Sequence, residues 1–214
     1  MGEIMTDTKI LTKDSHVWTK IKARKFNADW ASEVEVGEFL KAFVRMIKPE
    51  ACLEIGTFEG DAAIAIAQGI KENYQDSEHN SCYLTTVDNK DYGQKENIKD
   101  AGLEKWVHCI TNIGDDLIGT LRKRLYKSDN FSEDMVSAFD MIFIDDGHSY
   151  NEVMRDLENA HQLCMNGGYI LGHDVLAIPD VKNALNEFCL KYGNQYERLI
   201  LYSYAGLFIL HRKF

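Results

Sequence analysis

Residues 53–60 of the chain read LEIGTFEG. Apolar residues lead into this segment from Ala51, and a run rich in Ala and Ile follows it over 61–74, so the segment predicts a turn from a buried strand into a helix. Gly56 and Gly60 permit a tight turn and a close approach of another group to the backbone. The segment therefore indicates a strand–turn–helix unit of an α/β fold.

The same alternation of strands and helices continues along the chain. The patterns predict strands at 51–56, 83–88, 106–111, 139–145 and 169–172, and helices at 32–47, 61–74, 93–101, 115–126, 150–165 and 180–192. The tail, 196–213, predicts an antiparallel hairpin. Repeated strand–helix units imply a Rossmann-like, doubly wound α/β fold with a mostly parallel, seven-stranded sheet. We expect one domain over 32–214, preceded by an N-terminal extension, 1–31.

The composition narrows the classes of function. The 214 residues include 34 acidic and 24 basic ones, which gives a net charge of -10. Because binding to a phosphate backbone needs a basic surface, we expect a small-molecule substrate and no nucleic-acid partner. No apolar run approaches the ~18 residues of a membrane span, and residues 1–14 contain no apolar signal-peptide core, so we expect no membrane partner. The five cysteines form no CxxC pair, which favours free thiols in a reducing, cytoplasmic compartment.

The acids of the glycine-containing turn bear on the cofactor. The dinucleotide fingerprint is G-x-G-x-x-G, but Glu54 and Glu59 stand at its first and third glycine positions. Two carboxylates near a helix N-terminus repel a pyrophosphate, which disfavours a nicotinamide-dependent oxidoreductase. S-adenosylmethionine, with a sulfonium and an ammonium and no phosphate, fits better. Asp88 ends the second strand, where a carboxylate accepts ribose hydroxyls; a turn or helix cap at Asp88-Asn89 is the alternative.

Acids and histidines also follow the later strands. Ligands of doubly wound sheets bind beyond the carboxyl ends of the strands, so Asp145, His173 and Asp174 are expected to converge. Two carboxylates and an imidazole can hold a divalent cation that activates a substrate hydroxyl. His148 lies near the same edge and is a candidate for the base that accepts the hydroxyl proton. A loop histidine and a capping pair are the alternatives to these roles.

Three segments carry a resemblance to a known family: 34–67, FDMIFIDDGHSY at 139–150 and NGGYILGHDV at 166–175. They resemble the small O-methyltransferases, most closely the class I methyltransferase type 24 family, akin to the catechol and caffeoyl-CoA O-methyltransferases. The resemblance extends over 32–214. It implies a cofactor site for S-adenosylmethionine made of these residues: Glu54, Gly56, Thr57, Phe58, Gly60, Asp88, Asn89, Gly114, Asp115 and Asp145. Within this set, Asp88 takes the ribose hydroxyls, and Gly114 and Asp115 hold the adenine with Asn89 beside it.

The resemblance also implies a reaction centre. In the metal-dependent relatives, an acid after the fourth strand and an Asp-Asn pair after the fifth bind magnesium or calcium, and these positions fall on Asp145, His173 and Asp174. The catalytic lysine of those relatives falls on His148, so Asp145 and His148 are the catalytic candidates. The His173-Asp174 pair departs from the Asp-Asn pattern, because imidazole is a softer ligand. A metal-independent mechanism with His148 or His173 as the base therefore stays open beside Mg2+ or another divalent cation.

We accordingly expect O-methylation of a small-molecule hydroxyl, on a sugar or glycoside first and on a catechol-like phenol second. Fold-level analogy alone supports this choice of acceptor. The alternatives are a non-catalytic S-adenosylmethionine-binding module and, behind it, an NAD-dependent oxidoreductase. The resemblance further implies a homodimer that pairs through N-terminal helices. Residues 1–30 and the polar loop 128–137 are expected to face the substrate.

Overall fold

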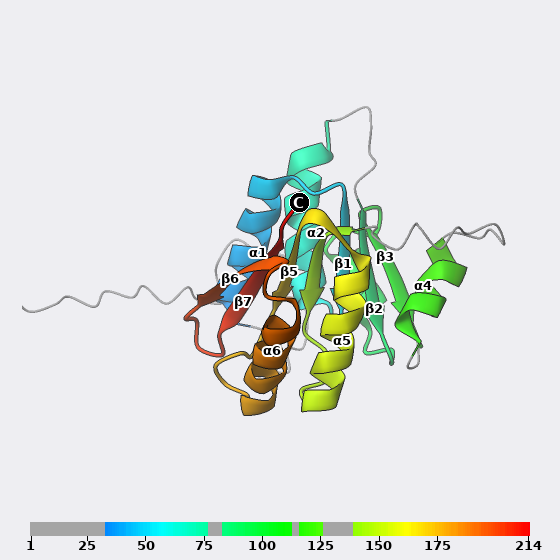
Figure 1. The fold of residues 1–214 in the computed structure, drawn as a ribbon. Helices are drawn as coiled ribbons and strands as arrows, with labels where there is room; N and C mark the ends of the chain where they lie inside the picture. Colours follow the sequence, from blue (N-terminus) through cyan, green and yellow to red (C-terminus); the bar gives the residue numbers. More distant parts are fainter. Residues whose placement is uncertain (1–32, 77–82, 113–115, 126–138) are drawn as a thin grey trace, which may run out of the picture.

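The computed structural model describes residues 33–76, 83–112, 116–125 and 139–214. Strands and helices alternate along these residues, as expected (Figure 1). The elements are α1 (Val34–Ile47), β1 (Ala51–Ile55), α2 (Asp61–Tyr74), β2 (Tyr83–Asp88), α3 (Gln94–Asp100), β3 (Val107–Thr111), α4 (Leu117–Leu125), β4 (Phe139–Ile144), α5 (Tyr150–Leu163), β5 (Cys164–Gly172), α6 (Pro179–Tyr192), β6 (Tyr196–Leu201) and β7 (Leu207–Arg212).

The strands form one seven-stranded sheet in the order β3-β2-β1-β4-β5-β7-β6. β1 pairs in parallel with β2 and β4, and the parallel pairing extends outward to β3 and β5. β7 runs antiparallel between β5 and β6. The predicted fold class, including the terminal hairpin, is confirmed. Because the strand order reverses beside β1, the carboxyl ends of β1 and β4 flank a topological switch point, where ligands of such sheets bind.

Two adjoining boundaries were wrong: the end of the fifth helix, and the start of the fifth strand, which was predicted at residue 169 and lies at Cys164. The pattern placed the end of the fifth helix at residue 165 and attributed it to Gly167-Gly168, but α5 ends at Leu163. Cys164 already has extended backbone angles, φ -78 and ψ 133, and pairs with Phe139 of β4. The register between β4 and β5 shifts between Phe139 and Met141. Pairing with β4 thus overrides the helical periodicity, and the glycine pair lies inside the strand.

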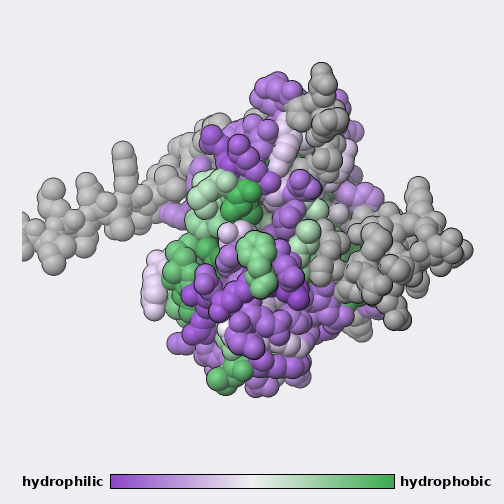
Figure 2. Space-filling model, turned by 45° about the horizontal axis from the view of Figure 1, so that its top comes forward, coloured by the Kyte–Doolittle hydropathy of each residue, from purple (hydrophilic) through white to green (hydrophobic). Residues whose placement is uncertain are grey.

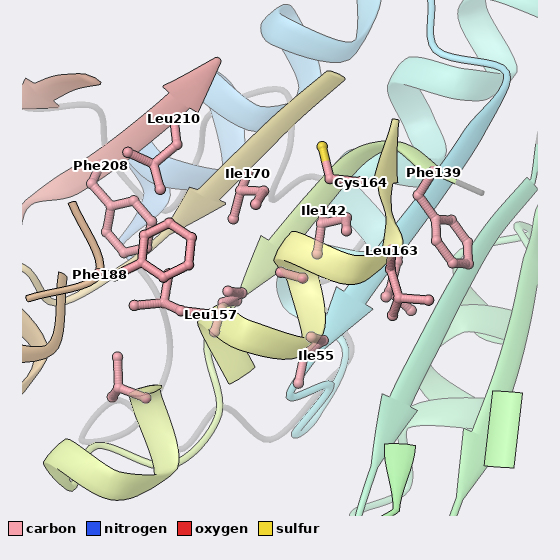
Figure 3. Close-up of a cluster of buried hydrophobic side chains, with 14 of the residues drawn as sticks. Ile55, Phe139, Ile142, Leu157, Leu163, Cys164, Ile170, Phe188, Phe208 and Leu210 are labelled. Carbon is pink, nitrogen blue, oxygen red and sulfur yellow. The ribbon is translucent and has the colours of Figure 1, made fainter. Parts of the chain in front are cut away.

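Helices cover both faces of the sheet, and each face has its own apolar core. Residues of α1, α2 and α3 pack on one face, with Leu40 and Phe143 among the fully buried side chains. The second core lies under α5 and α6, where Phe188 of α6 lies against Phe208 of β7 (Figure 3). Alternate residues of each central strand supply the two cores, as a strand buried on both sides requires. These cores fix the strand ends on which the site depends.

The sequence also predicted a protein without a membrane partner and with free cysteine thiols. The face shown in Figure 2 is largely hydrophilic, with apolar residues in small patches. Within the described ranges, no helix has the length and hydropathy to cross a membrane. Four cysteines lie in these ranges, and all are free thiols: Cys52, Cys109, Cys164 and Cys189.

Candidate active site

A cavity of about 920 Å³ opens beyond the carboxyl ends of β1, β2, β4 and β5. The structure brings these predicted site residues to its wall: Gly56, Thr57, Phe58, Asp88, Asn89, Asp145, His148, His173 and Asp174. Glu54 and Gly60 lie outside the lining. Gly114 and Asp115, the predicted adenine contacts, lie outside the described residues. The expectation that ligands bind beyond the carboxyl ends of the strands thus identified residues that, for the most part, surround one cavity.

Gly56 allows the ends of β1 and β4 to meet. Its φ is 91°, a left-handed conformation that favours glycine. A Cβ on this residue would lie 2.3 Å from the backbone oxygen of Asp145. The Gly56 N–H donates to the carbonyl of Val87 on β2, at 3.0 Å. Gly56 is therefore needed for close packing of three strand ends, and this packing carries Asp145 to the cavity.

Glu54 lies beneath the turn. Its side chain is fully buried, and Thr86 of β2 donates a hydrogen bond to one carboxylate oxygen. The hydroxyls of Thr86 and Thr57 are 2.5 Å apart, so Thr57 is drawn into the same network. Burial raises the pKa of Glu54 well above its ordinary value, and the charges of Asp145 and Asp88 add to this effect. The Oε1 atom of Glu54 has no hydrogen-bond partner among the described residues.

Asp88 connects the end of β2 to the glycine-containing turn. Its Oδ2 accepts a hydrogen bond from the N–H of Phe58 at 2.8 Å, and its Oδ1 accepts one from the N–H of Lys90 at 2.9 Å. Phe58 has a positive φ of 46°, which the bond to Asp88 helps to hold. Each carboxylate oxygen retains a further lone pair for a ligand hydroxyl. Asp88 therefore stabilises the turn and still has acceptor capacity toward the cavity.

An aromatic neighbour of this turn, Tyr92, was not among the residues predicted for the site. Tyr92 lines the cavity, and its ring centroid lies 4.9 Å from that of Phe58. It follows β2 in a segment that the strand pattern does not single out. A search of the four residues after each strand end would have found it.

Asp145, His148 and Asp174 come together on the opposite side of the cavity. One potential ligand atom from each lies within 4.8 Å of the others. The Nε2 atom of His148 is 2.6 Å from Oδ2 of Asp174, close enough for a strong, charge-assisted hydrogen bond. This bond to Asp174, together with nearby carboxylate charge, raises the pKa of His148 despite partial burial. The predicted catalytic residues Asp145 and His148 thus lie near each other.

His173 lies between Glu33 and the two acids of the predicted metal set, Asp145 and Asp174. Its Nε2 is 2.5 Å from Oε2 of Glu33, and its Nδ1 lies 3.5 Å from Asp145 and 3.6 Å from Asp174. Burial lowers the pKa of His173, but the bonds to Asp145 and Glu33 outweigh it and raise the pKa to about 11. An imidazolium donates from both nitrogens and has no lone pair for a metal. Among the described residues, the potential ligand atoms that lie within 4.8 Å of one another come from Asp145, His148 and Asp174, so this group contains His148 in place of His173.

Glu33, the partner of His173, is a second residue that the sequence analysis missed. Burial raises its pKa, but the ion pair with His173 and the Ala205 amide outweigh this and lower the pKa to about 2. The two residues of the pair lie 140 positions apart. Glu33 sits just before α1, away from any strand end, so strand-end reasoning could not find it.

The strand order and the position of the cavity define a Rossmann-like, class I methyltransferase architecture, and solved structures share it. The O-methyltransferase from Bacillus cereus in complex with SAH aligns with a TM-score of 0.67 at 20% identity, over 86% of this chain and 83% of that one. SAH-bound PaMTH1 of Podospora anserina aligns with a TM-score of 0.68 at 20% identity, over 92% and 86%. SAM-bound TomG of Streptomyces achromogenes, an O-methyltransferase of tomaymycin synthesis, gives 0.66 at 16% identity, over 87% and 83%. At these identities the likeness shows the fold.

The family follows from the sequence match. The model of a family described as a methyltransferase domain matches residues 53–175, more than half of the chain, and the chain belongs to this family. The match begins at the glycine-containing turn and ends just after Asp174, so it includes both sides of the cavity. The predicted resemblance is confirmed at this level. A comparison with curated proteins gave no significant match.

Proposed function

We propose that the protein is an S-adenosylmethionine-dependent O-methyltransferase that acts on a hydroxyl of a small molecule. The observation that carries this proposal is the single cavity that joins Asp88 and the glycine-containing turn to the Asp145–His148–Asp174 group. Similar structures in the same fold contain SAM or SAH and are described as O-methyltransferases, which supports the choice of cofactor and reaction.

The charge of the cavity supports a cationic cofactor. Among the described residues, its lining contains no Lys or Arg and six acidic residues: Glu33, Asp61, Asp88, Asp145, Asp146 and Asp174. A dinucleotide would bring a doubly charged pyrophosphate into this field, whereas S-adenosylmethionine brings a sulfonium and an ammonium. The proposed cofactor half is the side formed by β1, β2 and α2, where Asp88 accepts the ribose hydroxyls.

His148 is the proposed general base. In a methyl transfer, the acceptor oxygen forms a bond to the methyl carbon, the carbon–sulfur bond breaks, and the hydroxyl proton passes to a base. When Nε2–H of His148 donates to Asp174, Nδ1 carries the lone pair that can accept this proton. Asp174 acts as a positioning residue that fixes the tautomer and the ring. The cavity holds acceptor and cofactor together, and correct alignment supplies a large part of the rate.

A divalent cation is the second candidate for activation of the hydroxyl. Asp145, His148 and Asp174 fit such an ion by donor type and spacing, although an imidazole ligand favours Mn2+, Fe2+ or Zn2+ over Mg2+. When bound there, the ion would supply Lewis-acid activation of the acceptor oxygen.

Calorimetric titration of the full chain tests the cofactor. We expect binding of S-adenosylmethionine and S-adenosylhomocysteine, and none of NAD. Asp88→Ala should weaken binding of S-adenosylhomocysteine at least tenfold, while the exposed Asp100→Ala on the same side of the sheet should leave it unchanged. Binding of NAD and of neither sulfur compound would refute the proposal.

An acceptor screen tests the reaction. Formation of S-adenosylhomocysteine is measured with sugars, glycosides and catechols, with and without Mg2+ or Mn2+ and after treatment with a chelator. Turnover that survives chelation supports the His148–Asp174 dyad, and turnover that depends on an added metal supports the cation. Cofactor binding without turnover on any acceptor would favour the non-catalytic module instead.

A further inference from the structure

Glu33 occupies the N-cap position of α1, yet its side chain does not cap the helix. The short side chains of Ser, Thr, Asp and Asn are the usual caps at this position, and Glu is not among them. The backbone carbonyl of Glu33 accepts hydrogen bonds from the N–H groups of Val36 and Gly37, at 3.0 and 3.3 Å. The side chain makes no capping bond and lines the cavity instead. Its direction therefore calls for an explanation outside the helix.

Both carboxylate oxygens of Glu33 bind groups of the cavity wall. Oε2 is 2.5 Å from Nε2 of His173, and Oε1 accepts a hydrogen bond from the N–H of Ala205 at 2.7 Å. The residues come from the start of α1, the end of β5 and the β6–β7 turn. One side chain thus joins three segments that are far apart in the sequence.

Ala205 extends this connection to the β5–α6 loop. Its carbonyl accepts hydrogen bonds from the N–H groups of Leu176 and Ala177, at 2.8 and 3.0 Å. Ala177, Tyr204 and Ala205 line the cavity on the side away from the glycine-containing turn. Tyr204 is 93% exposed, so the backbone bonds of its neighbour fix its place more than its own packing does. Release of the Ala205 N–H would loosen this whole side of the wall.

We infer that Glu33 is a positioning residue for methyl transfer. One carboxylate oxygen holds His173 between Asp145 and Asp174, and the other holds Ala205 and with it the wall that carries Tyr204. The cofactor half depends on Gly56 and Asp88, whose bonds lie within β1 and β2. Glu33 therefore controls the other side of the cavity, where His173, Tyr204 and Ala205 lie, and we call this side the acceptor half. This inference rests on the proposed function in assigning that half to the acceptor.

Three variants of the full chain test the inference. Glu33→Ala removes both bonds, and Glu33→Gln keeps an oxygen that can accept from Ala205. Glu35→Ala is the matched control, because it removes the same charge from the first turn of α1 at a position outside the cavity lining. The measurements are amide hydrogen exchange at Ala205, Leu176 and Ala177 by NMR, calorimetric affinity for S-adenosylhomocysteine, and KM and kcat with an acceptor from the screen.

In Glu33→Ala we expect exchange at Ala205 to become at least about tenfold faster than in the wild type, as for the loss of one charge-assisted hydrogen bond. Affinity for S-adenosylhomocysteine should change by less than about twofold, while the acceptor KM rises more than kcat falls. Glu33→Gln should restore most of the protection at Ala205, and Glu35→Ala should match the wild type.

Unchanged exchange at Ala205 in Glu33→Ala overturns the inference, and so does an equal loss of cofactor and acceptor affinity. The exchange measurement needs no acceptor, so an unchanged rate at Ala205 overturns the inference even when the screen yields none. Failure of the wild type to bind S-adenosylhomocysteine would instead refute the proposed function. The two failures are therefore distinguishable.

Discussion

Asp156 of α5 is a buried carboxyl group whose charge the fold does not stabilise well. It is 2% exposed, and its Oδ2 has no hydrogen-bond partner among the described residues. Its Oδ1 lies 3.4 Å from Nε of Arg155, a long contact. Burial, with the nearby charge of Asp146, raises the pKa of Asp156 from 3.8 to about 7, and Arg155 offsets only part of this. We predict that Asp156→Asn stabilises the protein at alkaline pH.

The sign and the size of the predicted difference in stability follow from proton linkage. Between pH 3.8 and about 7, the folded protein keeps a proton on Asp156 that the unfolded chain has lost, so the free energy of unfolding falls as the pH rises through this window. The window spans roughly three pH units, and each is worth about 1.4 kcal/mol, which gives up to about 4 kcal/mol. An amide resembles the neutral acid in size and cannot ionise. Asp156→Asn should therefore match the wild type near pH 4 and exceed its stability by up to about 4 kcal/mol at pH 8.

Urea unfolding between pH 4 and 8 measures this difference by linear extrapolation. The exposed Asp100→Asn is the matched control and should follow the wild type at every pH. The reasoning fails if Asp156→Asn keeps the pH slope of the wild type, or if it is the less stable protein at pH 8. A difference that is equally large at pH 4 would also contradict it, because both proteins then carry a neutral side chain at this position.

Three other substitutions test the site. Gly56→Ala should lower the free energy of unfolding in urea by several kcal/mol, because the new Cβ would lie 2.3 Å from the Asp145 backbone oxygen and the residue has a left-handed φ. A free energy of unfolding near the wild-type value would show that the ends of β1 and β4 can separate. Thr86→Val should lower the free energy of unfolding by about 1–3 kcal/mol in the same assay, since it removes the hydroxyl that donates to the buried Glu54. An unchanged free energy of unfolding would mean that the Glu54 carboxyl is stabilised by other groups. His148→Ala should lower turnover about 10²–10⁴-fold with unchanged calorimetric affinity for S-adenosylhomocysteine, and retained turnover would exclude it as the base.

The fold and the convergence of strand-end residues on the cavity were predictable because they depend on simple rules of sequence and topology. The turn at 53–60 needed only the glycine positions and the flanking apolar runs, and in the structure Gly56 and Gly60 both have a positive φ. The convergence of Asp88 and Asp145 followed from the strand-end rule for parallel sheets. The end of α5 at Leu163 did not follow, because pairing of Cys164 with Phe139 of a distant strand decides it.

The other side of the cavity, with Glu33, His148, His173 and Asp174, depends on contacts that such rules do not contain. The bond between Glu33 and His173 joins positions 140 residues apart and involves the first residue that the structure describes. The bond between His148 and Asp174 depends on the path of the β4–α5 loop. No periodicity reports either distance, so residue types could suggest the group but not its pairing.

One feature of the predicted metal set could nevertheless have been questioned from the sequence. His173 and Asp174 are adjacent at the end of a strand, and successive side chains of a strand point to opposite faces. In the structure, Asp174 has a left-handed backbone, φ 64°, and meets His148, whereas His173 reaches Glu33. The two neighbours thus have different main partners, although Nδ1 of His173 also lies 3.5 Å from Asp145 and 3.6 Å from Asp174. The residue that departs from the Asp-Asn pattern is therefore also the one that contacts Glu33 at the start of α1.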